Sequence, residues 1–315
     1  MKSKRIFMTI FLCITALSIL DAQRQTGSPK GTEIGTSGLA ITIIPLECNF
    51  PIHGREPQKA DVINYKIEFK KLADKYNIII DWHTGSYRDE IPDGLMTARN
   101  ANDWELEAYA PILISELSLY PVIFVQKAQL KRIIVCRDLW VDSRGRNENV
   151  SATLDNKNKT LYLCISYTYK VNNRYKQRRV IHHAFFHMLD DVMGLINKDS
   201  EWAKINPEGF NYGDYGLGGQ YDRSSEAGLL TDKYPGFLNK YSTGYLADDK
   251  ADIFAYMMVL YHYVEKRAKK DKVIEAKMQL MKKRLKQFCS DVNSNFWKKV
   301  EKIKRNITPY KTLLP

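Results

Sequence analysis

His183 and His187 are the residues whose types and spacing point most directly to chemistry. They lie four apart in the run HHAFFH, inside a stretch whose apolar periodicity predicts a helix. A spacing of four places both imidazoles on one helix face, one turn apart, where both can reach a single Zn²⁺ at about 2.0–2.1 Å. The spacing alone leaves open the alternative of two ordinary core or surface histidines.

The residues around the pair extend this pattern into a family resemblance. From His183 to Asp191 the chain reads HAFFHMLDD, which resembles the HExxHxxDD helix of the anthrax lethal factor catalytic domain and its relatives among the glutamate-zincin metallopeptidases. It is also similar to predicted secreted zinc peptidases with an HHEFFHMxD helix. In the glutamate-zincins a tyrosine, six further residues and an ExxAE helix complete the site. Here Tyr241 precedes Asp248 by that spacing, and Asp248 and Asp252 replace the two glutamates.

The resemblance implies a role for each matched position. Three zinc ligands are implied, with the fourth position left to water or substrate: His183, His187 and Asp248. Tyr241 would donate its hydroxyl to the oxyanion of the tetrahedral intermediate. Asp190 and Asp252 would accept hydrogen bonds from the ligand histidines and so orient them. Each of two residues has an ordinary alternative role. Asp is a preferred helix N-cap, so Asp248 could be only a cap. Tyr241 could be only a packing residue, since the chain has nineteen tyrosines.

Ala184 occupies the position of the general base in the HExxH pattern. A methyl group cannot take a proton from zinc-bound water, and general acid–base help of this kind is worth about 10²–10⁴-fold. Neither His182 nor the two aspartates Asp190 and Asp191 can be placed at that water from sequence. Three interpretations stay open: a natural pseudo-enzyme, an enzyme inactivated by one substitution, or a member of a family with another base. The aspartate at position 248 favours natural drift.

The elements that must position these residues are predicted by periodicity and turn signals. The zinc helix is expected over residues 174–193, closed by Gly194, and an irregular stretch over 197–244 separates it from a helix over 248–264. The other expected helices and strands cover residues 39–45, 61–76, 78–82, 102–119, 131–136, 160–167, 271–288 and 295–304, with a polar turn region at 145–159. Mixed elements followed by helices only predict an α+β fold. With the resemblance, the expectation is a zincin-like metallopeptidase domain with a mixed sheet, an HxxxH zinc helix and a helical C-terminal part.

The strand expected over residues 160–167 precedes the zinc helix, as an edge strand does in zincins. By that resemblance it would pair with an extended peptide substrate through main-chain hydrogen bonds. An ordinary internal strand is the alternative.

The first residues predict export. Three basic residues precede an apolar run that is shorter than a membrane-spanning helix, which predicts a signal peptide over residues 1–22. Residues 23–38 are polar and small, as in a flexible arm, and residues 39–315 are expected to form the single metallopeptidase-like domain. We therefore expect a secreted or extracytoplasmic protein with no transmembrane segment after cleavage. Its four remaining cysteines allow three disulfide pairings that the sequence cannot rank.

The charge of the chain is concentrated near its end. From Glu265 to Arg305 there are fifteen Lys and Arg against five Asp and Glu, a net of +10, in a chain whose total is +12. A solvated helical face explains this run, and a contact with an acidic surface is the sharper alternative. No nucleic-acid-binding motif accompanies the run, so nucleic acid is not an expected partner.

These observations leave two functional classes. The first is a secreted zinc-dependent metallopeptidase of protein or peptide substrates, expected to be weak or inactive because of Ala184. The second is a non-catalytic zincin-fold pseudo-enzyme or binding protein that recognises a peptide or an acidic surface. Whether the chain is an enzyme stays open at the level of sequence, and a metal-free core helix is a third possibility.

Overall fold

The structure is a computed structural model of the full chain. It describes residues 44–45, 64–82, 85, 87–91, 94–143, 146–166, 171–196, 198–213 and 228–304. The expected signal peptide and flexible arm, residues 1–38, lie outside the described residues, as does Cys48. All of the described elements belong to one compact unit, Gly38–Pro315.

Seven strands in the described part of the chain form one mixed sheet. They are β1 (Ile44–Pro45), β2 (Ile79–Asp81), β3 (Tyr87–Ile91), β4 (Gly94–Asn100), β5 (Arg132–Ser143), β6 (Arg146–Asp155) and β7 (Thr160–Cys164). The strand order is β1-β6-β7-β5-β4-β3, and β2 pairs with β5 beside this path. The expected mixed sheet is therefore present.

Strand β5 is long enough to take part in two different pairings. Its first residues pair in parallel with β2 and β7, and its later residues pair antiparallel with β4 and β6. The change falls between Cys136 and Trp140. Within this segment Asp138 has a φ of +50°, in the left-handed region that Asp tolerates better than most residues. Ser166 Oγ accepts the hydrogen bond from the Asp138 N–H at 3.0 Å.

Two expectations about strands are wrong. Residues 146–155 form β6 and are not a turn region, since the hairpin turn before β7 is confined to 156–159. Strand β7 is internal: β5 and β6 pair with its two sides, and all five of its residues are buried. Its main-chain groups are satisfied within the sheet, so it cannot receive a peptide substrate by strand addition.

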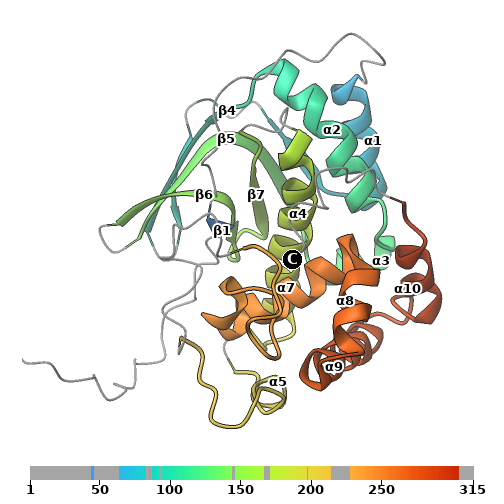
Figure 1. Ribbon diagram of the computed structural model, residues 1–315. Helices are drawn as coiled ribbons and strands as arrows, with labels where there is room; N and C mark the ends of the chain where they lie inside the picture. Colours follow the sequence, from blue (N-terminus) through green and yellow to red (C-terminus); the bar gives the residue numbers. More distant parts are fainter. Residues whose placement is uncertain are drawn as a thin grey trace, which may run out of the picture. The chain divides into compact units, whose positions relative to one another are not determined.

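Helices cover one face of this sheet and continue alone to the end of the chain. They are α1 (Tyr65–Tyr76), α2 (Asp103–Leu117), α3 (Val122–Lys127), α4 (Val171–Val192), α5 (Ser200–Ala203), α7 (Leu246–Val259), α8 (Tyr261–Ala268), α9 (Lys272–Phe288) and α10 (Ser294–Glu301). Helix α4 packs on β6 and β7, with α2 and α7 against it, and Figure 1 shows it between the sheet and the other helices. None of the described helices is both long and apolar enough to cross a membrane.

Helix α4 ends as the sequence predicts. Gly194 takes a φ of +69°, and the N–H groups of Leu195 and Gly194 donate to the carbonyls of Asp190 and Asp191 at 3.0 and 2.9 Å. This is the Schellman arrangement, in which a residue without Cβ satisfies the last carbonyls of a helix.

The expected helix over residues 248–264 is two helices, α7 and α8. The chain breaks at Leu260, with φ −138° and ψ 49°. The rest of the helical C-terminal part agrees with expectation.

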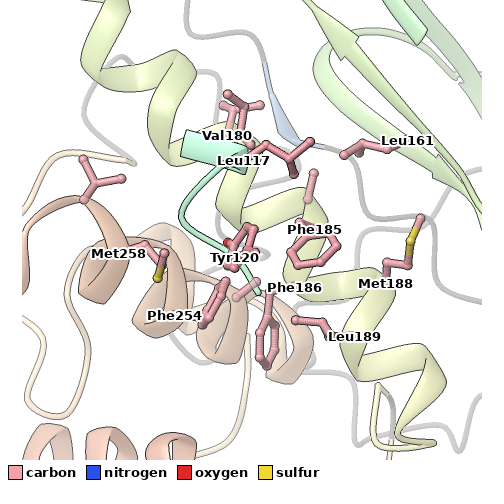
Figure 2. Packing of buried hydrophobic residues seen from close by; sticks show 14 of the residues in the cluster. Leu117, Tyr120, Leu161, Val180, Phe185, Phe186, Met188, Leu189, Phe254 and Met258 are labelled. Atoms are coloured by element: carbon pink, nitrogen blue, oxygen red, sulfur yellow. The ribbon is translucent and has the colours of Figure 1, made fainter. Parts of the chain in front are cut away.

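An aromatic core joins α4 to α7. Phe185 and Phe186 from α4 pack with Tyr120 and with Phe254 from α7, and all four side chains are buried; Figure 2 shows them converging between the two helices. Fully burying one such side chain contributes roughly 1.5–3 kcal/mol relative to leaving it exposed. This packing fixes the relative position of the two helices that carry the candidate site.

The described cysteines form no disulfide. Cys136, Cys164 and Cys289 are free and buried, and burial raises the pKa of the Cys136 and Cys164 thiols. Of the three pairings that four cysteines allow, each would require at least one bond between two of these described thiols.

Candidate metal centre

The two histidines of the HxxxH pair face the same point. Their Nε2 atoms lie 2.9 Å apart, and both side chains are fully buried. They converge because α4 is regular through this region, so residues 183 and 187 are one turn apart on one face.

Asp248 brings a third donor from a different helix. Its Oδ1 lies 3.4 Å from each histidine Nε2, and its side chain is buried. It is the third residue of α7, whose N-cap is Tyr245, so the N-cap explanation of Asp248 is wrong. A carboxylate in the first turn is favoured by the helix dipole. The three donor atoms lie within 4.8 Å of one another, a group able to hold a metal ion.

The spacing of these donors fits a tetrahedral zinc with one small adjustment. Two ligands bonded at the usual N and O distances stand roughly 3.4 Å apart around a tetrahedral ion, which matches both Asp248 separations. The 2.9 Å between the histidines is shorter, so a bound ion would move the two rings apart by a few tenths of an ångström. The donor set, two imidazoles and a carboxylate, is one that zinc accepts with an open fourth position.

The electrostatics of the group depend on burial and on two carboxylates. Burial lowers the pKa of His183, but its hydrogen bonds with Asp248 and Asp252 outweigh burial and hold the pKa above its ordinary value. Burial, with the neighbouring His183, lowers the pKa of His187 to about 4 although Asp248 opposes this shift. Burial would raise the pKa of Asp248, yet hydrogen bonds from both histidines hold it below its usual range. A neutral His187 beside an ionised Asp248 has the protonation states that a metal requires, whereas His183, with its raised pKa, would release a proton when a metal binds.

Asp252 lies behind His183, where the resemblance implies an orienting partner. Its Oδ1 lies 2.8 Å from His183 Nδ1 and also accepts from Arg179 Nη1 at 2.6 Å. Burial would raise its pKa, but the Arg179 charge and the His183 hydrogen bond hold that pKa far below its usual range.

Asp190 has a different neighbour from the one expected. Its Oδ2 lies 2.7 Å from Lys250 Nζ, and no hydrogen bond joins it to His187 among the described residues. Burial raises the pKa of Asp190 to about 6 even though Lys250 opposes the shift. His187 Nδ1 is buried without a hydrogen-bond partner in the described structure, so the two ligand histidines are not supported equally.

Tyr241 lies beside the three donors, and Ala184 directly follows His183 in the chain. The Tyr241 hydroxyl donates to Asp248 Oδ1 at 3.1 Å, and its ring is 5.8 Å from the His183 ring. Burial and Asp248 raise the pKa of this tyrosine well above its ordinary value, so it remains a donor. Ala184 is 1 % exposed and belongs to the hydrophobic core.

Several residues of the site were not expected from sequence. They are Arg179, Asn239, Ser242 and Lys250, which bind the carboxylates of Asp252 and Asp190. Arg179 carried a usable signal, because it precedes His183 by four residues on the same helix face. The others come from the irregular stretch or from α7, and nothing in their local sequence indicates the contact.

A second group of metal-ligand type lies on the surface, at His262, Glu265 and Glu301. His262 is 70 % exposed and its Nδ1 lies 3.9 Å from Glu265 Oε2. Exposed groups of this kind are common without an ion, and we assign it no role.

Comparison with known proteins adds a similarity of fold only. No family model matches the chain, and no curated protein sequence matches it. Among solved structures the chain is similar to a candidate zinc-binding metallo-peptidase from Bacteroides caccae, at 16 % sequence identity and a TM-score of 0.49. The match covers 80 % of this chain and 97 % of that one. A similarity at this level says nothing about function, which is inferred from the site residues alone.

Proposed function

We propose that this chain is a secreted zinc-binding protein of the metallopeptidase type, in which peptide hydrolysis is weak or absent. The convergence of the His183 and His187 Nε2 atoms with Asp248 Oδ1 carries the zinc part of the proposal. Ala184, at the position of the general base, supports the proposal that peptide hydrolysis is weak or absent.

Each residue of the site has a separate task. His183, His187 and Asp248 would hold the ion, which when bound supplies a Lewis acid able to polarise a carbonyl and acidify a water. Asp252 orients His183 through its Nδ1. Tyr241 holds Asp248 through its hydroxyl, and that hydroxyl is the donor available to a developing oxyanion. No residue among these can take a proton from water in the way a glutamate at position 184 would.

Burial of the whole group favours the non-catalytic alternative within this proposal. His183, His187, Asp248 and Tyr241 are each at most 3 % exposed, and β7 has no free edge for a peptide. Three protein ligands are typical of catalytic zinc and four of structural zinc, so it is the lack of access for a substrate that supports the non-catalytic alternative. The ion would then stabilise the contact of α4 with α7, and a partner molecule would bind at other surfaces of the protein.

The decisive experiment is zinc content after brief dialysis against a weak chelator, which strips loosely held surface ions. We expect about one zinc per chain in the wild-type protein and none in His183→Ala. His182→Ala is the matched control, because His182 is the adjacent buried histidine but contacts Glu116 instead of the three donors. Zinc retained by His183→Ala, or lost equally in both variants, would refute the site.

We further propose an acidic surface as partner of the helices α8 to α10. Exposed lysines on these helices and directly beside their ends support this, among them Lys270, Lys286, Lys298, Lys299 and Lys302. Exchange of Lys298 and Lys299 of α10 and of its C-cap Lys302 for glutamine should weaken salt-dependent retention on heparin; unchanged retention would favour a merely solvated face.

A further inference from the structure

The carboxylate of Asp252 is the most completely bonded polar group near the candidate metal centre. Its Oδ1 is shared by Arg179 Nη1 at 2.6 Å and His183 Nδ1 at 2.8 Å. Its Oδ2 accepts from Asn239 Nδ2 at 2.7 Å and from Ser242 Oγ at 3.0 Å. The residue itself is fully buried. Four donors on two oxygens leave this carboxylate no other orientation.

Three separate segments meet at this carboxylate. Arg179 and His183 come from α4, Asp252 comes from α7, and Asn239 and Ser242 come from the irregular stretch before it. Ser242 is itself held by Asn239: its N–H donates to Asn239 Oδ1 at 2.8 Å, and its single hydroxyl proton is shared between Asn239 Oδ1 at 2.8 Å and Asp252 Oδ2. The position of Asp252 is therefore set by the tertiary structure and not by α7 alone.

Arg179 is the charged member of this set. Its side chain is 6 % exposed and pairs with Asp252, and its guanidinium lies 5.5 Å from the centre of the Tyr256 ring. A charged donor makes the shortest and strongest of such hydrogen bonds. Of the four donors it contributes most to keeping Asp252 directed at His183.

We infer that Arg179 is a positioning residue for the metal ligand His183, acting through Asp252. Asp252 accepts the Nδ1 proton of His183, which leaves Nε2, the ring atom beside Asp248 and His187, as the one that would give up its proton to hold the ion. Arg179 holds Asp252 in the place where it can do this. The inference rests on the proposed zinc binding and adds to it that the two histidines are unequal, since His187 Nδ1 has no such support in the described structure.

The chain supplies a matched control one residue away. Arg178 also leaves α4 and pairs with a buried carboxylate, Glu116, which is 1 % exposed. Glu116 in turn contacts His182 Nε2 at 2.9 Å, a histidine outside the three donors. Arg178→Met thus removes the same kind of ion pair from the same helix without contact with the candidate centre.

Zinc affinity is measured by chelator competition in the wild-type full chain and in three variants: Arg179→Met, Arg179→Lys and Arg178→Met. We expect about 10–100-fold weaker zinc binding in Arg179→Met, a smaller loss in Arg179→Lys, and wild-type affinity in Arg178→Met. Thermal midpoints recorded in parallel should fall in both methionine variants. Equal zinc affinity in Arg179→Met and Arg178→Met would overturn the inference.

A spectroscopic readout separates positioning from general stability. In zinc-loaded protein with ¹⁵N-labelled histidine, we expect the Nδ1 proton of His183 to be protected from exchange with water in the wild type and in Arg178→Met, and to exchange faster in Arg179→Met. If Arg179→Met does not fold, Ser242→Ala removes one weaker donor and should lower zinc affinity several-fold; unchanged affinity there would also count against the inference. A wild-type chain that binds no zinc would instead refute the proposed function.

Discussion

At position 184 a methyl group lies next to a candidate zinc ligand and is 1 % exposed. It is a single-residue departure from the HExxH pattern, and it removes the group that would accept a proton from water. The contacts of Asp248 with His183 and Tyr241 are present without that group. The present site is thus suited to holding an ion better than to using it.

The substitution Ala184→Glu tests whether catalysis was lost at this residue. With zinc bound, we expect hydrolysis of a fluorogenic peptide mixture to rise by about 10²–10⁴-fold, because a general base returns. Ala184→Gln is the control, since it has nearly the same size and shape but cannot take the proton. Equal hydrolysis by the two variants would argue that no peptidase activity is latent in this site.

At the scale of elements, α4 and α7 are joined twice. The aromatic core packs one part of their contact, and the polar group of His183, His187, Asp248 and Asp252 fills another. A buried ion pair also connects α7 to the later helices. Lys277 of α9 pairs with Asp249 of α7 at 2.7 Å, and both side chains are fully buried.

The pair of Asp199 and Arg284 joins α5 to α9 and predicts a pH dependence. Arg284 Nη2 donates to Asp199 Oδ1 at 2.8 Å. Burial would raise the pKa of Asp199, but hydrogen bonds from Arg284 and from the Trp202 N–H hold that pKa below its usual range. A depressed carboxyl pKa stabilises the fold above the unfolded value and loses that effect as pH falls through the folded pKa.

Arg284→Met should therefore lower the free energy of unfolding by about 3 kcal/mol at pH 7, and by less as the pH approaches about 3.5, near the ordinary pKa of an aspartate. Urea unfolding across this pH range measures the difference. Lys283→Met is the control, because Lys283 is the neighbour of Arg284 in α9 and forms only an exposed pair with Glu201 of α5 at 3.9 Å, which contributes little to stability at any pH. A loss for Arg284→Met that does not change with pH would contradict the assignment.

At the scale of the whole molecule, zinc would link the sheet-packed helix α4 to the helical C-terminal part that begins with α7. A ligand bound only by the folded state adds about 2.7 kcal/mol at a concentration one hundred times its Kd. For a domain of this size that corresponds to a rise of roughly 5–10 °C in the unfolding midpoint.

We expect this rise when zinc is added to the metal-free wild-type chain, and no rise in Asp248→Asn, which keeps the shape of the side chain but lacks its charge. Calorimetry at matched zinc concentrations measures both. An equal rise in the two proteins would place the stabilising ion elsewhere, for example at the exposed group of His262, Glu265 and Glu301.

The local sequence pattern was enough to predict several helices and one residue pair of this molecule. Helix geometry and capping involve residues only a few positions apart. Short-range rules therefore predict the helix α4 with its end at Gly194, the pairing of His183 with His187, and the helices α9 and α10. A resemblance in spacing also pointed to Asp248 from the sequence alone, although it lies 61 positions after His187.

Tertiary structure decided the features that depend on contacts between residues far apart in the sequence. Residues 146–155 are a strand because β5 and β7 offer them hydrogen-bonding partners, although their polar composition favours a turn. For the same reason β7 is internal and not an edge. The approach of Arg179, Asn239 and Ser242 to Asp252 depends on three segments packing together. Asp190 pairs with Lys250 because α7 brings that lysine within 2.7 Å, a long-range contact that no periodicity encodes.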